Sequence, residues 1–211
     1  MSELTDRRRE EKDRRRNEIL DAAAVVAAEA GFDAINMDLV ARQARLSRAL
    51  VYVYFEDKQA LQLALCERAL EILQERFAVA TADARTGRDR LAAMGTAYVA
   101  FSQEQPVYFE ALARFEARTA TELNQSSRTL ELGDACHDHL TAAIREGIAD
   151  GSIRADVGPP NAVAIVLWGF MHGVIQIAVT KAALLTHRGT SAPELFEHAL
   201  ALTLRSLGPT T

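Results

Sequence analysis

The sequence predicts an all-α protein built from two helical domains, and three observations support this fold class. Hydrophobic residues make up 49% of the 211 residues, which is ample for a buried core. Aromatic residues reach only 6% while alanine and leucine dominate, a composition that favours helices. Apolar residues also recur at three- and four-residue steps, the period of a helix with one buried face. We expect a small N-terminal domain at 1–56 and a larger C-terminal domain at 57–211.

The first segment, residues 6–16, is dense in charge. As a helix it would place Glu10 four residues before Arg14 and Glu11 four residues before Arg15, the favourable order for ion pairs. Two interpretations remain open for its leading arginines. They could form a flexible arm that reaches a minor groove or phosphates, or a frayed and solvated terminus.

Residues 17–30 predict the first helix of the small domain, with an apolar side that includes Ile19, Leu20 and Val26. Gly31 should end this helix, and Phe32 should pack back onto it. A bundle of about 40 residues is only marginally stable alone, so we expect the small domain to pack against the larger one.

Residues 36–58 predict two short helices around a tight turn. Asn36 and Ser47 are good N-caps for the first and second helix, and Asp38 places a carboxylate where the helix dipole favours it. The second helix has an apolar stripe that consists of Leu46, Leu50, Val51, Tyr54 and Phe55.

The opposite face of that second helix carries Arg48, Ala49 and Tyr52. Arg48 and Tyr52 are four residues apart and therefore neighbours on the helix surface, with the small Ala49 between them. A short helix with a flat, donor-bearing face suits a DNA major groove. The alternative is an ordinary helical hairpin with Tyr and Phe in its core.

The run Leu46-Ser47-x-x-x-Val51-Tyr52-x-Tyr54-Phe55-x-x-Lys58-x-x-Leu61 resembles the helix-turn-helix signature of the TetR family of bacterial transcription regulators. There are two departures: Arg45 stands where the family prefers Gly in the turn, and Ala49 where it often has Gly. A non-glycine residue with positive φ costs about 1 kcal/mol. Either Arg45 tolerates that strain or the turn differs, and its side chain could also reach a phosphate.

The helix face and the resemblance together assign roles in binding double-stranded operator DNA. Arg48 is the candidate for bidentate guanine readout. Tyr52 should contact a phosphate or a thymine methyl, and Lys58 should clamp a phosphate. The full set of expected DNA-binding residues is Asn36, Arg45, Ser47, Arg48, Tyr52, Tyr54 and Lys58.

The rest of the chain predicts a connector helix and then the helices of the larger domain. The connector should run from Lys58 to Ala80 as one rigid helix. The polar stretch 119–127 predicts a loop or helix entry. The remaining helices are expected at 91–103, from Pro106, at 130–150 up to Gly151, from Pro160, and from Pro193 to about Leu207.

Residues 162–180 are very apolar and contain Gly169 and Gly173, so their length and composition would permit a membrane span. His172 and Gln176 lie four apart on one face, and both are costly in lipid. We therefore favour a helix in a homodimer interface and expect no membrane contact. The TetR resemblance implies an interface formed by the last two helices, here 160–185 and 193–207.

The same resemblance implies a small-molecule effector in the larger domain, whose binding swings the connector helix. Each of the candidate lining residues is more often plain core, but together they suggest an apolar or aromatic effector: Met94, Tyr98, Phe101, Tyr108, Phe109, Phe115, Trp168 and His172. The family base rate favours a repressor that the effector releases from a palindromic operator. The alternatives are a helical enzyme or a protein-assembly scaffold that uses the same cavity.

Charge and cysteine content limit the other classes. The net charge of -5 argues against non-specific nucleic-acid binding by the whole molecule. Residues 1–60 contain 11 Lys and Arg and 12 Asp and Glu, so the expected DNA-binding segment is not basic in bulk. Two cysteines and a charged N-terminus without a secretory apolar region indicate the cytoplasm. Cys136 and His139 share a helix face, but further metal ligands at suitable spacing are missing, so we expect no metal, no cofactor and no catalytic residues.

Overall fold

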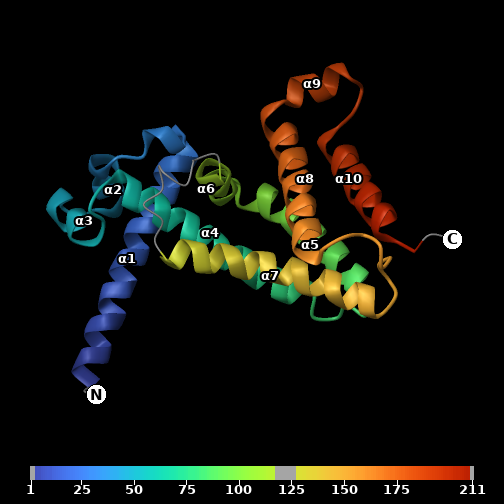
Figure 1. Cartoon of the computed structure of the whole chain (residues 1–211). Helices are drawn as coiled ribbons and strands as arrows, with labels where there is room; N and C mark the ends of the chain where they lie inside the picture. Colours follow the sequence, from blue (N-terminus) through green and yellow to red (C-terminus); the bar gives the residue numbers. More distant parts are fainter. Residues whose placement is uncertain (1–2, 117–126, 210–211) are drawn as a thin grey trace. The chain divides into compact units, whose positions relative to one another are not determined.

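The computed structural model describes residues 3–116 and 127–209. Over these residues the chain forms ten α-helices and one 3-10 helix, with no β-strand among them, which confirms the all-α fold class (Figure 1). The predicted loop at 119–127 lies, up to residue 126, outside the described residues.

In chain order the elements are α1 (Glu3–Ala30), η1 (Phe32–Ala34), α2 (Met37–Ala44), α3 (Arg48–Tyr54), α4 (Lys58–Ala80), α5 (Gly87–Glu104), α6 (Pro106–Glu116), α7 (Ser127–Ala149), α8 (Pro160–Thr180), α9 (Ala182–His187) and α10 (Ala192–Leu207). They form two compact units. The head unit comprises the described parts of residues 1–69 and 105–129, and the body unit those of 70–104 and 130–211. Helix α4 begins in the head unit and continues into the body unit.

The head unit is a helical bundle around one apolar core. Ile19 and Leu20 of α1, Val40 of α2, Val51 of α3 and Leu61 of α4 are each no more than 1% exposed. Gly31 ends α1 with φ 88°, and the next residue, Phe32, is buried, as the sequence predicts. Helix α6, placed in the larger domain by the sequence analysis, also packs against α1 and η1 in this unit.

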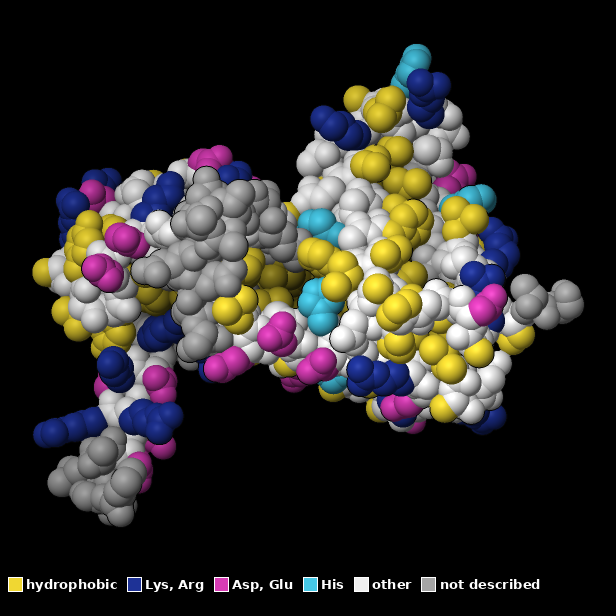
Figure 2. Space-filling model, viewed as in Figure 1, with side chains coloured by type: hydrophobic (Ala, Val, Ile, Leu, Met, Phe, Trp, Pro, Cys, Tyr) yellow, Lys and Arg dark blue, Asp and Glu magenta, His cyan; other side chains and the backbone are white. Residues whose placement is uncertain are grey.

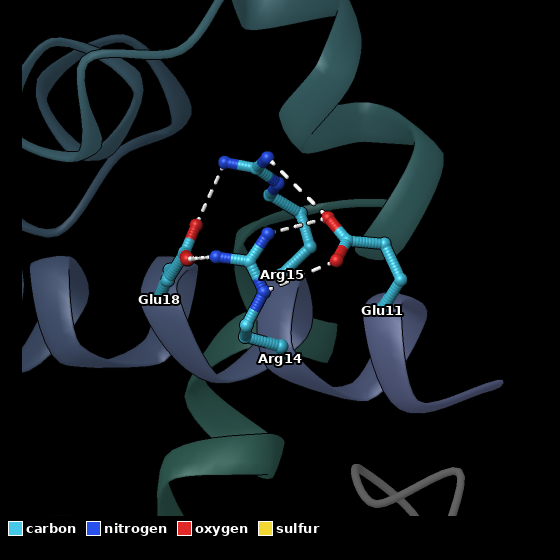
Figure 3. A network of polar contacts seen from close by, with 4 residues as sticks. All are labelled: Glu11, Arg14, Arg15 and Glu18. Carbon is cyan, nitrogen blue, oxygen red and sulfur yellow. Dashed lines mark hydrogen bonds and ion pairs between the residues drawn. The ribbon is translucent and has the colours of Figure 1, made fainter. Parts of the chain in front are cut away.

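Helix α1 begins at Glu3, well before the expected residue 17, because the charged segment continues the helix. Figure 3 shows four of its charged side chains, Glu11, Arg14, Arg15 and Glu18, in contact along the helix. Arg15 bonds Glu18 at 2.7 Å and lies 3.7 Å from Glu11, the predicted i,i+4 partner. Arg14 binds Glu11 at 2.6 Å and Glu18 at 2.7 Å instead of the predicted Glu10. Exposed ion pairs of this kind support a helix only weakly, because water and salt screen them. The arginines of 7–16 are therefore presented on a helix rather than on a flexible arm.

The body unit contains the second part of α4 together with α5, α7, α8, α9 and α10. At one helix crossing, a Cβ placed on Gly87 of α5 would lie 2.1 Å from the backbone nitrogen of Gly147 on α7, so these two backbones are in direct contact. Helices α8 and α10 pack against each other and against α5. The expected helix over 160–185 is interrupted at Lys181, whose φ of -125° and ψ of 34° separate α8 from α9.

Helix α8 exposes an apolar stripe that no other part of the described chain covers. Ile165, Val166 and Val179 are 56%, 67% and 61% exposed, and Figure 2 shows hydrophobic side chains gathered over α8 and α10. Methyl groups added at Gly169 or Gly173 would meet nothing within 4 Å. By length and composition alone, α8 could also cross a membrane, with 22% of its most apolar window buried.

Candidate nucleic-acid interface

Two side-chain caps build the helix-turn-helix of the head unit, and both match the sequence prediction. The Asn36 side-chain oxygen accepts a hydrogen bond from the Leu39 backbone N–H at 2.9 Å and so caps α2. The Ser47 hydroxyl accepts from the Leu50 N–H at 3.2 Å and caps α3. Because these N–H groups would otherwise lack partners, the caps fix where each helix begins.

Arg45 occupies the turn between α2 and α3 in the left-handed conformation, with φ 57° and ψ 39°. It is the one non-glycine residue with positive φ in the part of the chain that the structure describes. The backbone N–H of the following residue, Leu46, donates to the Ala41 carbonyl at 2.9 Å and helps close the turn. The turn therefore keeps the geometry that a glycine would give, and Arg45 bears strain of about 1 kcal/mol.

Helix α3 buries one face and exposes the other. Val51 is fully buried, whereas Arg48, Ala49 and Tyr52 are exposed, as the spacing predicts. Val53 is 72% exposed and was missed by the sequence analysis. Val53 lies four residues after the exposed Ala49 and therefore on the same side of the helix, and that spacing was the available signal.

The Arg48 guanidinium is held by two neighbours on this exposed face. Its Nη1 lies 3.2 Å from an Asp38 carboxylate oxygen, and its Nη2 donates to the Tyr52 hydroxyl at 3.3 Å. The guanidinium carbon also lies 5.5 Å from the centre of the Tyr52 ring. The hydrogen bond to Tyr52 and then the charge of Asp38 raise the pKa of Arg48 above its ordinary value, so its positive charge is secure.

Lys58 and Tyr54 are less free than the sequence analysis assumed. The Lys58 ammonium donates to the backbone carbonyl of Asp33 at 2.8 Å, and Tyr54 is half-buried against the head core. Asp33 itself accepts two bonds from Arg114 of α6, at 2.7 and 3.0 Å, and the Arg114 guanidinium lies 5.2 Å from the Phe32 ring centre. Hydrogen bonding to Arg114 lowers the pKa of Asp33, which keeps this carboxylate charged.

The expected effector-lining residues divide between the two units. Tyr108, Phe109 and Phe115 belong to α6 in the head unit, while the other five belong to α5 and α8 in the body unit: Met94, Tyr98, Phe101, Trp168 and His172. Tyr108 lies 3.4 Å from Arg68 of α4, which also binds Asp21 of α1 at 2.5 Å. This network joins α1, α4 and α6 within the head unit.

In the body unit an aromatic and histidine cluster joins α5, α7 and α8. The Tyr98 hydroxyl lies 2.7 Å from His172 Nδ1, and the Trp168 ring centre lies 5.9 Å from that of His172. The His137 ring meets the edge of Trp168 at 5.2 Å, and its buried Nδ1 has no hydrogen-bond partner. Desolvation by burial lowers the pKa of both His137 and His172, which favours their neutral forms. His137 is not among the predicted site residues, because residue spacing indicates only a possible metal-binding role for its neighbours Cys136 and His139.

Two family matches cover most of the chain. Residues 19–65 match the family described as bacterial regulatory proteins, tetR family, and residues 91–203 match the tetracyclin repressor-like C-terminal domain. A curated relative, the HTH-type transcriptional activator FasR of Mycolicibacterium smegmatis, is 28% identical over 127 residues. That alignment covers 60% of this chain and 57% of FasR, so it spans less than two thirds of the relative's length.

Solved structures share the fold over nearly the whole chain. A protein of unknown function from Rhodococcus sp. RHA1 superposes with a TM-score of 0.76 at 25% identity, covering 92% of this chain and 96% of its own. The fatty acid degradation regulator FadR from Bacillus halodurans gives 0.72 at 17% identity, covering 90% and 94%. A TetR family regulator from Marinobacter aquaeolei VT8 gives 0.69 at 20% identity, covering 97% and 100%. Because family matches cover both the helix-turn-helix and more than half of the chain beyond it, this protein belongs to the TetR family of transcription regulators, which bind operator DNA and dimerise.

Proposed function

We propose that α3 enters the DNA major groove and that its exposed face reads the operator. One observation carries this proposal: Arg48, Ala49 and Tyr52 share the exposed side of a helix whose other side is fixed in the head core. Arg48 supplies the bidentate donor for a guanine, and Tyr52 and Lys58 contact phosphates. Asn36, Arg45, Ser47 and Tyr54 complete the interface.

A second copy of the chain covers the apolar stripe of α8 and packs its own α8 and α10 against the same helices. Exposed Ile165 and Val166 on α8 and Leu202 on α10 support this arrangement, because a stripe of this size is costly to leave in water. Two head units then read two half-sites about 34 Å apart or a multiple of that spacing, so the operator is palindromic. A C-terminal half paired in this way accounts for the apolar α8 without a membrane, in keeping with a cytoplasmic regulator.

A small, apolar molecule binds the body unit beside the aromatic and histidine cluster and releases the operator. The buried apolar side chains of Met94 and Phe101, on the same helix as Tyr98, supply apolar contacts for such a molecule. The Tyr98 hydroxyl and the His172 ring supply hydrogen-bonding atoms. The signal reaches the head unit along α4, which is one continuous helix through both units. Coupling of this kind typically amounts to about 1–3 kcal/mol.

The first experiment measures binding to duplexes that the protein selects from a randomised library. Arg48→Ala should cost about 1–3 kcal/mol and relax preference at one base pair, whereas Lys58→Ala should weaken binding to all sequences and reduce the salt slope by about one unit. Arg85→Ala, an exposed arginine of the body unit, is the matched control. Unchanged affinity and base preference in Arg48→Ala would show that the recognition face is wrongly assigned. An enzyme or a scaffold would select no duplex at all.

The second experiment establishes the direction of regulation. A reporter gene placed behind the selected operator should be silenced by the protein and restored when an effector is added. Because the relative FasR is named an activator, the reporter must also be built with the operator upstream of a weak promoter. If reporter expression rises when the protein is present in that arrangement, the protein is an activator and the proposed repression is wrong. The proposed DNA-reading face would be unaffected by that result.

A further inference from the structure

The carboxylate of Asp38 lies on the proposed DNA-reading face, where a negative charge is repelled by every phosphate. It comes from the first turn of α2, and its side chain is half exposed beside the Arg48 guanidinium of α3. Stabilisation of the helix dipole alone does not require contact with Arg48, since an acidic side chain anywhere in the first turn serves that purpose. The contact across the two helices therefore calls for its own explanation.

Asp38 and Tyr52 hold Arg48 at two of its three nitrogens and leave N–H groups for a base. Nη1 faces the carboxylate and Nη2 donates to the hydroxyl. A guanidinium has five N–H donors, so at least three remain, enough for the two acceptors O6 and N7 of guanine. Arg48 can thus keep both protein partners while it binds a guanine edge.

We infer that Asp38 is a positioning residue that makes DNA reading by Arg48 selective, an inference that rests on the proposed function of α3. On a matched operator, Arg48 retains Asp38 and bonds the guanine in a preset orientation. On unmatched DNA no guanine edge meets the free N–H groups, and turning the Arg48 guanidinium toward a phosphate instead costs its pair with Asp38. The carboxylate therefore lowers affinity for unmatched DNA more than affinity for the operator.

The test compares Asp38→Asn with the wild-type protein on the selected duplex and on an unrelated duplex of equal length. An exposed ion pair favours the paired arrangement over the unpaired one by a factor of about two to five in the equilibrium constant. Exclusion of water at the protein–DNA interface strengthens this preference. We expect discrimination between the two duplexes to fall roughly three- to tenfold. On the unrelated duplex the salt dependence should steepen by about 0.9, the value of one additional phosphate contact.

Two matched variants separate this effect from charge and from folding. Glu56→Gln removes one exposed carboxylate from the same head unit, outside the contacts of Arg48, and should leave discrimination unchanged. Asp38→Glu keeps the carboxylate and the favourable dipole term, and it should recover at least half of the lost discrimination. If Glu56→Gln reproduces the loss, or Asp38→Glu fails to recover it, the inference is overturned.

A double-mutant cycle with Arg48→Ala shows whether Asp38 acts through Arg48. In the Arg48→Ala background, Asp38→Asn should change discrimination no further. An equal change in both backgrounds, or unchanged discrimination in Asp38→Asn alone, would refute the positioning role. If Arg48→Ala itself has no effect, the proposed recognition face fails as well, so the two failures are distinguishable.

Discussion

The proposed dimer face can be tested with one small truncation, Val166→Ala. This change removes two carbon groups, each worth about 0.8 kcal/mol when fully buried. Val166 is 67% exposed in the single chain, so about two thirds of that value is available to a covering partner. Each subunit then contributes about 1 kcal/mol less to the free energy of association, and the two-fold symmetric dimer loses about 2 kcal/mol. This loss raises the dimer dissociation constant by about 30-fold.

Sedimentation equilibrium over a dilution series measures that constant directly. Val79→Ala is the matched control, because Val79 is 72% exposed on α4, outside α8 to α10, and loses the same two carbons. It should leave the dissociation constant unchanged. An identical constant for Val166→Ala and wild type, an equal weakening by Val79→Ala, or a wild-type protein that stays monomeric at every concentration would refute the reasoning.

Three further predictions concern stability. Arg45→Gly should raise the free energy of unfolding in urea by about 0.5–1 kcal/mol, because glycine adopts φ 57° without a Cβ clash, while Arg45→Ala should bring no gain. Ser191→Ala removes the hydroxyl of the capping box that Ser191 forms with Glu194 at the start of α10, so the same measurement should fall by about 1 kcal/mol. Burial lowers the pKa of His172, so its contribution to stability is complete above pH 6.5 and is lost as the pH falls through the lowered pKa. His172→Gln should therefore flatten the decline of the melting temperature below pH 6.5. The control His187→Gln, at an exposed position, should leave that decline unchanged.

Local signals in the sequence were sufficient to predict the helix-turn-helix. The caps at Asn36 and Ser47 each depend on atoms within a few residues, so the chain encodes them directly. The bounds of α4, Lys58–Ala80, and the start of α6 at Pro106 were predicted for the same reason. Helix spacing also predicted that Arg48, Ala49 and Tyr52 of α3 face outward, although it did not identify Val53. The left-handed conformation of Arg45 was one of two open alternatives, and the structure decides between them.

Contacts between separate elements could not be predicted in this way. The bond from Lys58 to the Asp33 carbonyl spans 25 residues, and the ion pair from Asp38 to Arg48 joins two helices. Both depend on how helices pack, which residue spacing does not specify. The early start of α1 was missed because its first turns lack an apolar stripe and extend instead through ion pairs between exposed side chains.

The effector-lining residues were the least predictable part of the site. Burial and aromatic character are shared by core residues and cavity residues, so they could not separate Phe109 from Phe101, which belong to different units. The bond between Tyr98 and His172 and the unpaired nitrogen of His137 distinguish the body cluster from ordinary core. Those features depend on the approach of α5, α7 and α8 in space.

Gly169 and Gly173 on α8 have a consequence for how sequence changes in this protein should be interpreted. Inside one subunit there is open space where their side chains would be, and alanine is the better helix former by about 1 kcal/mol per site. The isolated chain would therefore gain from replacing them. If alanine at either position lowers activity or assembly, the cause must be a contact outside the subunit. Substitutions there therefore test packing against a neighbouring molecule and not the stability of the fold.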